Sequence, residues 1–148
     1  MHESINVLLC EDSEHDILAT KRAWKKFNIS NPLYVVNDGA ACMNFLTNKE
    51  EYSDPNDAPP ISLLLLDLNM PKMGGVEVLK AIRQIPNIRH LKIVVLTTSQ
   101  SDEDQLSTYD HCVNAFITKP IIFEDFAETM NRINMFWTLV QPGACLKP

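Results

Sequence analysis

The feature of the sequence that most constrains its fold is a short apolar run, residues 61–66, which ends in a carboxylate at Asp67. Segment 69–75, with one proline and two glycines, follows it. An apolar run of this length, stopped by Pro and Gly, predicts a buried strand that ends at a loop. Buried strands of α/β sheets present their functional groups at their carboxyl ends. We therefore expect Asp67 to lie at such an edge.

Three other apolar runs also end in polar groups, and they span residues 5–10, 91–96 and 114–118. Glu11 and Asp12 follow the first, Thr97 follows the second and Lys119 follows the third. The carboxyl ends of parallel strands meet at the same edge of a sheet. We therefore expect these four side chains to lie close to Asp67.

Strand-like and helix-like patterns alternate along the whole chain. The expected strands are 5–10, 33–36, 62–66, 91–96 and 114–118, and the expected helices lie near 14–27, 40–48, 75–84, 103–111 and 123–138. Five successive βα units predict an α/β fold with a parallel, doubly wound sheet and helices on both faces. Right-handed crossovers favour the flavodoxin-like strand order 2-1-3-4-5. The first helix has residues at roughly helical spacing, namely Ile17, Leu18, Lys21, Trp24 and Phe27.

Composition limits the classes of partner. The 148 residues predict one domain, and the net charge of −6 argues against non-specific binding to nucleic acid or an anionic membrane. No apolar stretch approaches the ~20 residues that a membrane span needs, and no signal peptide is visible. The four cysteines have no metal-site spacing, so we expect Cys10 and Cys42 to be buried and the protein to be cytoplasmic.

Two segments exceed what five βα units need. Segment 49–60 is polar and proline-rich, and it predicts a surface loop longer than most. Segment 135–140 is unusually apolar for a position so near the end of the chain.

The expected edge of the sheet has the chemistry of a phosphoryl site. Asp67 can attack phosphorus, and Asp12 with Asp67 offers the two carboxylates that Mg²⁺ prefers. Glu11 would assist through water, and the backbone carbonyl of Asn69 would complete the coordination. Lys119 and Thr97 would contact phosphate oxygens, and we expect Lys119→Ala to have a small or even favourable effect on stability.

These residues resemble the pattern of two-component response regulator receiver domains, the CheY-like family. The residues that match are Glu11, Asp12, Asp67, Met70, Pro71, Met73, Gly75, Thr97, Lys119 and Pro120. The resemblance covers about residues 5–138 and implies a single receiver domain over 1–148, with 139–148 as a C-terminal extension.

The resemblance implies a role for each matched position. A histidine kinase would phosphorylate Asp67, and Mg²⁺ or another divalent cation would bind Asp12, Asp67 and the Asn69 carbonyl, with Glu11 acting through water. Thr97 would be the switch hydroxyl, and the Lys119–Pro120 bond would be cis. The aromatic switch position is Phe116, which lacks the hydroxyl of the tyrosine that the family often has there.

The long 49–60 loop and the Phe136–Trp137 pair are similar to a subgroup, the single-domain regulators that partner cyanobacterial and bacterial phytochrome kinases. That resemblance implies a phytochrome histidine kinase as partner and a homodimer that involves Phe136 and Trp137. The protein would signal by contact with another protein or pass its phosphoryl group on, because no DNA-binding output domain is recognised.

Two other classes of protein agree less well with the sequence than a signalling switch. Phosphatases of the haloacid-dehalogenase type also begin from a strand-end Asp, but they place a second Asp two residues later as general acid. The residue there is Asn69, which cannot protonate a leaving group. A flavodoxin-type FMN module is disfavoured because no Ser/Thr/Gly-rich phosphate loop follows Cys10.

Overall fold

The computed structural model describes residues 5–26, 28–68, 70, 72–97, 113–119 and 122–132. The elements are β1 (Val7–Cys10), α1 (Glu14–Lys26), β2 (Leu33–Val36), α2 (Gly39–Thr47), the 3₁₀ helix η1 (Glu50–Tyr52), β3 (Leu63–Asp67), α3 (Gly75–Gln84), β4 (Lys92–Thr97), β5 (Ala115–Thr118) and α5 (Phe123–Arg132). The helix expected near 103–111 lies outside the described residues.

The five strands form one sheet in the order β2-β1-β3-β4-β5, and every neighbouring pair is parallel. Both the predicted fold class and the predicted strand order are therefore confirmed. Asp67 is the last residue of β3 and pairs in register with Leu96 of β4. Thr97 is the last residue of β4 and pairs with Thr118 of β5. The register therefore brings these polar residues to the same edge.

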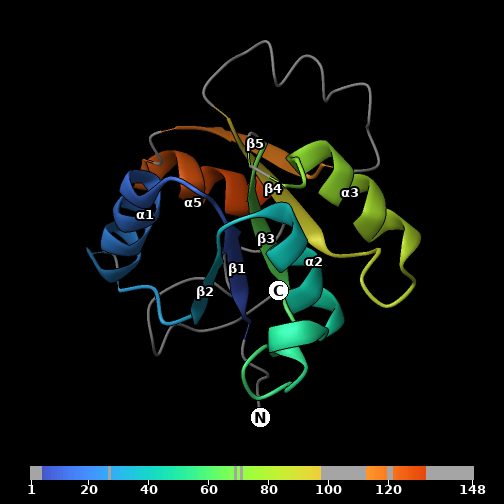
Figure 1. Cartoon of the computed structure of the whole chain (residues 1–148). Coiled ribbons are helices and arrows are strands. Elements are labelled where there is room, and N and C mark those ends of the chain that lie inside the picture. The colour runs from blue at the N-terminus through green and yellow to red at the C-terminus, as the bar shows by residue number, and fades with distance from the viewer. Residues whose placement is uncertain are drawn as a thin grey trace.

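The sheet has a hydrophobic core on each face. Successive side chains of a strand point to opposite faces, so Val7 and Leu9 of β1 join one cluster while Leu8 and Cys10 join the other. Helix α1 adds Ile17 and Trp24 to the first of these clusters, whereas α2 and α3 pack on the second. Figure 1 shows this layering, with α1 and α5 on one side of the sheet and α2 and α3 on the other.

The buried face of α1 differs at two positions, Leu18 and Thr20, from the spacing expected from sequence. In α1, Leu18 is 41% exposed, and Thr20 is buried with Ile17 and Trp24 instead. A helix turns about 100° per residue, so Leu18 lies off the face that Ile17 defines. Phe27 lies outside the described residues.

Segment 49–60 lies at the surface, as expected, and includes the 3₁₀ helix η1. Asn48 ends α2 in the left-handed conformation, and its Nδ2 donates to the carbonyls of Tyr52 (3.1 Å) and Ala58 (2.9 Å). The Tyr52 ring lies 5.0 Å from that of Phe45, and Ala58 is buried. The Asn48 side chain thus ties two points of segment 49–60, Tyr52 and Ala58, to the end of α2.

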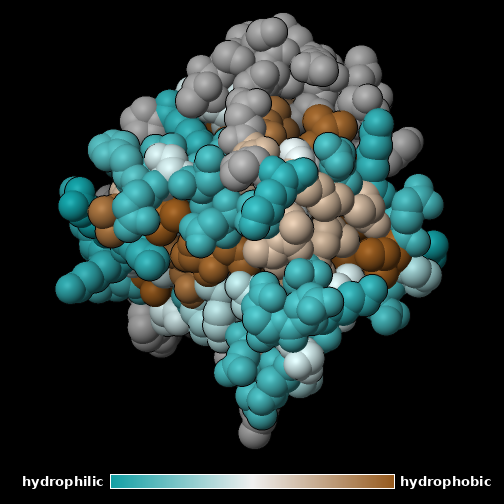
Figure 2. All heavy atoms as spheres, viewed as in Figure 1, coloured by the Kyte–Doolittle hydropathy of each residue, from teal (hydrophilic) through white to brown (hydrophobic). Residues whose placement is uncertain are grey.

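The surface in the view of Figure 1 is mixed in polarity. Figure 2 shows a band of hydrophobic residues across the middle of this face, with hydrophilic residues above and below it. Among the described residues, no helix combines the length and the apolar character that crossing a membrane requires.

Candidate functional site

Three carboxylates meet at the carboxyl ends of β1 and β3. Glu11 and Asp12 directly follow β1, and Asp67 ends β3, the neighbouring strand. One ligand oxygen from each of the three lies within 4.8 Å of the others. Glu11 and Asp67 are buried, with 1% and 6% of their surface exposed, whereas Asp12 is exposed. The site is therefore open to solvent on the side of Asp12.

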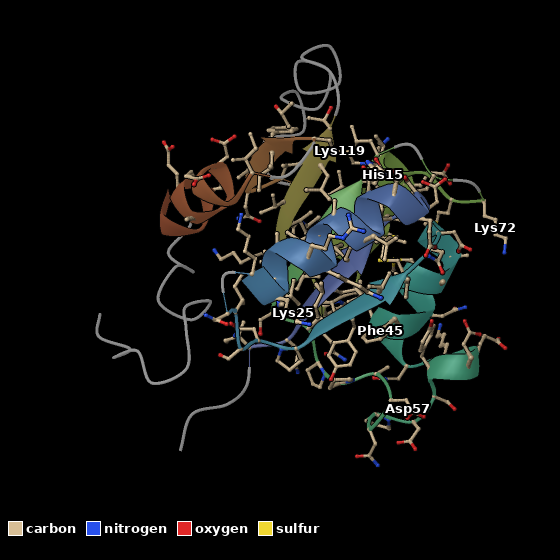
Figure 3. All side chains as sticks on the ribbon, turned by 90° about the vertical axis from the view of Figure 1, so that its left-hand side faces the viewer. His15, Lys25, Phe45, Asp57, Lys72 and Lys119 are labelled. Atoms are coloured by element: carbon tan, nitrogen blue, oxygen red, sulfur yellow. The ribbon has the colours of Figure 1, made fainter. Side chains whose placement is uncertain are left out.

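Lys119 supplies a positive charge to this cluster. Its Nζ lies 2.6 Å from Glu11 Oε1, 3.2 Å from Asp67 Oδ1 and 3.1 Å from Asp16 Oδ2. The residue follows β5 and is fixed by its own backbone N–H, which donates to the carbonyl of Thr97 at 2.8 Å. Figure 3 shows Lys119 at the carboxyl edge of the sheet, beside the end of α1 that carries His15.

Asp16 is the member of this arrangement that the sequence analysis did not identify. It lies in the first turn of α1, where an acidic residue is expected to interact with the helix dipole. Only the three-dimensional structure shows that its carboxylate faces Lys119, which follows β5. The one signal in the sequence was the Ser13-x-x-Asp16 spacing of a helix cap.

The two expected switch positions differ in their surroundings. Thr97 is buried, with 3% of its surface exposed, at the end of β4. Phe116 of β5 is half-buried and packs against the core cluster beneath α2 and α3, beside its register partner Val95. Four other expected site residues, Asn69, Pro120, Phe136 and Trp137, lie outside the described residues.

The excess of carboxylates perturbs the ionisation of the site. Burial, together with the charge of Asp67, raises the pKa of Glu11 to about 7, although Lys119 acts in the opposite direction. Burial alone would lower the pKa of Lys119, but its hydrogen bond to Glu11 and the charge of Asp67 outweigh burial and raise it. Burial is therefore the main cause of the raised Glu11 pKa, whereas the neighbouring carboxylates cause the raised Lys119 pKa and keep the ammonium charged.

The loops beside the site are held together. Asp38 caps α2 by accepting from the N–H of Ala41 at 2.8 Å, and this hydrogen bond holds the pKa of Asp38 below its usual range. Its other carboxylate oxygen lies 3.4 Å from Nζ of Lys72, in the loop after β3. Gly39, the first residue of α2, lets the backbone of Met73 in the loop after β3 approach closely, because a Cβ at position 39 would collide with the carbonyl oxygen of Met73.

The donor set suits a hard divalent cation. The cluster offers carboxylate oxygens, which such ions prefer. Both oxygens of Glu11 already have partners, Lys119 on Oε1 and the N–H of Ser13 on Oε2 at 3.2 Å. These two contacts leave Glu11 less available as a direct ligand of a cation.

Comparison with known proteins places this geometry in a family. The model of the response regulator receiver domain matches residues 7–131. Response regulator Rcp1 of Synechocystis is 37% identical over 140 residues, which are 93% of each chain.

Solved structures agree with the sequence matches. The structure of the bacteriophytochrome response regulator AtBRR superposes with a TM-score of 0.84 at 32% identity, over 94% of this chain and 99% of that one. The Mn²⁺-bound form of Rcp1 gives a TM-score of 0.72 at 34% identity, over 97% and 99% of the two chains. The expected resemblance to phytochrome response regulators is confirmed. With the polar ends of β1, β3, β4 and β5 at one edge of the sheet and a family match over most of its length, the chain belongs to the response regulator receiver domains.

Proposed function

We propose that Asp67 is the phosphoacceptor of a phosphorelay and that a histidine kinase is its donor. One carboxylate oxygen of Asp67 attacks phosphorus, the phosphorus–nitrogen bond of the phosphohistidine breaks, and the imidazole takes up a proton. The observation that carries this proposal is the contact of Lys119 Nζ with Asp67 Oδ1 at 3.2 Å. An ammonium at that position can stabilise the charge on the transferring oxygens.

The cation that best suits this site is Mg²⁺. Asp12, Asp67 and the backbone carbonyl of Asn69 would hold it, with Glu11 in contact through water. When bound, it supplies a positive charge that neutralises phosphate oxygens. The protein's own part is to hold Asp67 immobile at the end of a buried strand, with Lys119 against it.

Phosphorylation would then act as a switch through Thr97 and Phe116. The new charge at Asp67 offers acceptor oxygens to a hydroxyl at the end of the adjacent strand. Phe116 lies one strand further, half-buried, where it can change its packing without opening the inner core. The chain works in this proposal as a phosphoacceptor switch, which catalyses only its own phosphorylation and dephosphorylation.

The partner that we propose is a bacterial phytochrome kinase. Support comes from relatives described as bacteriophytochrome and cyanobacterial phytochrome response regulators. We also propose that the chain forms a homodimer through Phe136 and Trp137 and passes its signal to a downstream protein by contact. The haloacid-dehalogenase alternative is not favoured, because Asn69 replaces the required acid and the family match is to receiver domains.

Phosphotransfer from purified kinases tests the proposal. A radiolabelled phytochrome kinase, mixed with this protein and Mg²⁺, is expected to lose label to the wild type within seconds to minutes and none to Asp67→Asn. A hybrid kinase from another pathway serves as control for specificity. Equal labelling of Asp67→Asn would overturn the proposed acceptor, and transfer only from the control kinase would overturn the proposed partner.

A further inference from the structure

We propose that Asp16 is a positioning residue that holds the Lys119 ammonium over Asp67. The inference rests on the proposed function, since it assigns a residue to the phosphoryl site, and the sequence pattern gives no such role. Asp16 Oδ2 lies 3.1 Å from Lys119 Nζ, although the two residues are 103 positions apart.

The first turn of α1 leaves the Asp16 carboxylate available for this contact. In a capping box, the acid at the third helical position reaches back to the N–H of the capping residue. Here Ser13 is the cap, because its Oγ accepts the N–H of Asp16 at 3.3 Å. Glu11 Oε2 instead accepts the N–H of Ser13, at 3.2 Å. The usual partner of Asp16 is therefore occupied, and its side chain turns to Lys119.

These contacts close into a ring. The Lys119 ammonium forms ion pairs with the carboxylates of Glu11 and Asp16. Glu11 also accepts the backbone N–H of Ser13, and the Ser13 hydroxyl accepts the backbone N–H of Asp16. A closed ring couples the start of α1 to the residue that follows β5, so the ammonium cannot move without disturbing the cap. The ring orients Lys119 from two sides, of which Asp16 is one.

The number of donors explains why a second anchor is useful. A lysine ammonium has three N–H groups, and among the described residues it contacts three carboxylates, those of Glu11, Asp16 and Asp67. Once Asp67 becomes an acyl phosphate, its carboxylate charge is lost and a phosphoryl oxygen takes its place as acceptor. Glu11 and Asp16 keep the other two N–H groups, so the third stays aimed at the phosphoryl group.

Asp16 is set apart from the metal ligands. The carboxylates close enough to share a cation are those of Glu11, Asp12 and Asp67. Asp16 also adds a negative charge, which by itself would repel an anionic phosphoryl donor. Positioning and repulsion have opposite effects on the rate, and the substitutions below separate them.

The test compares Asp16→Ala, Asp16→Asn and the control Glu14→Ala with the wild type. Glu14 is the other acid in the first turn of α1, so its removal subtracts the same charge from the same turn. Two quantities are measured in each protein: the rate constant for phosphorylation by phosphoramidate with Mg²⁺, and the ¹H–¹⁵N signal of the Lys119 ammonium. That signal reports how firmly the ammonium is held, which a loss of fold stability alone would not change.

Asp16→Ala should slow phosphorylation and broaden the ammonium signal. Since the Asp16 side chain is 29% exposed, the expected slowing is that of a partly exposed ion pair, roughly three- to fivefold. Asp16→Asn keeps an oxygen acceptor and should remain within about twofold of the wild type. Glu14→Ala should change neither quantity.

Three results would overturn the inference: faster phosphorylation in both Asp16 variants, equal slowing in Glu14→Ala, or an unchanged ammonium signal in Asp16→Ala. Failure of the proposed function has a different signature. In that case the wild type itself accepts no phosphoryl group, and the ammonium signal still decides whether Asp16 holds Lys119.

Discussion

Replacing Lys119 with methionine should destabilise the metal-free protein, and the loss should grow with pH. Lys119 compensates Glu11, which is 1% exposed, and Asp67, which is 6% exposed. Breaking a buried ion pair by removing one partner costs about 3–5 kcal/mol when the other charge must remain. Glu11 can escape this cost by taking up a proton, because burial already raises its pKa to about 7.

Protonation of Glu11 sets the size of the stability loss in Lys119→Met. With a pKa of about 7, ionisation of Glu11 stabilises the native wild type by less than about 1 kcal/mol at pH 7 and by about 2 kcal/mol at pH 8.5, relative to a site where Glu11 stays protonated. Lys119→Met loses this stabilisation from ionised Glu11, because Lys119 is the group that lowers the pKa of Glu11. Loss of the ion pairs with Asp67 and Asp16 adds at least about 1 kcal/mol. The total loss is then at least roughly 1–2 kcal/mol at pH 7 and at least about 3 kcal/mol at pH 8.5.

The direction in which stability changes with pH follows from the pKa shifts of Glu11 and Lys119. A raised carboxyl pKa contributes stability that is present at low pH and lost as pH rises, in the wild type between about 4.5 and 7. In Lys119→Met the pKa of Glu11 is higher still, so the decline continues beyond pH 7. The raised pKa of Lys119 itself adds no slope below its ordinary value of 10.5.

Urea unfolding of both proteins in EDTA, at pH 6, 7 and 8.5, measures these differences. Adding Glu11→Gln to Lys119→Met should remove the excess loss at pH 8.5, since no buried acid is left to ionise. Equal stability of Lys119→Met and wild type at pH 8.5, or a loss that is independent of pH and insensitive to Glu11→Gln, would show that Lys119 does not compensate the charge of Glu11. It would restore the expectation from sequence that this lysine matters little for stability.

Three further predictions concern the metal and the loops. Millimolar Mg²⁺ should raise the melting temperature of the wild type by mass action, and Asp12→Ala should remove most of that increase in a thermal melt. Gly39→Ala should cost more than 1 kcal/mol in urea unfolding because its Cβ would collide with the Met73 backbone, whereas Gly74→Ala, with its nearest atom at 3.9 Å, should cost less than about 1 kcal/mol. Asn48→Ala should lose about 1–3 kcal/mol by the same assay, since two backbone carbonyls lose their donor and a left-handed position loses a tolerant residue. Unchanged stability in Gly39→Ala or Asn48→Ala would contradict the contacts seen.

The residues at strand ends could be predicted from sequence because parallel pairing alone brings them together. Asp67, Thr97 and Lys119 each follow or end an apolar run, so the strand order sufficed to place them on one edge. Asp16 could not be found in this way, because it lies in a helix and its contact with Lys119 depends on tertiary packing rather than on strand order. Asn48 was missed for a similar reason, since its two acceptors lie in an irregular segment without periodicity.

The position of the phosphoryl group is the most direct test of Asp67 as the phosphoacceptor. Borohydride reduces an acyl phosphate of aspartate to homoserine, which tandem mass spectrometry assigns to one position in the sequence. After phosphorylation in Mg²⁺, we expect homoserine at position 67 and at no other acid of the cluster. Homoserine at Asp12, or a phosphorylated protein without any homoserine, would contradict this role of Asp67.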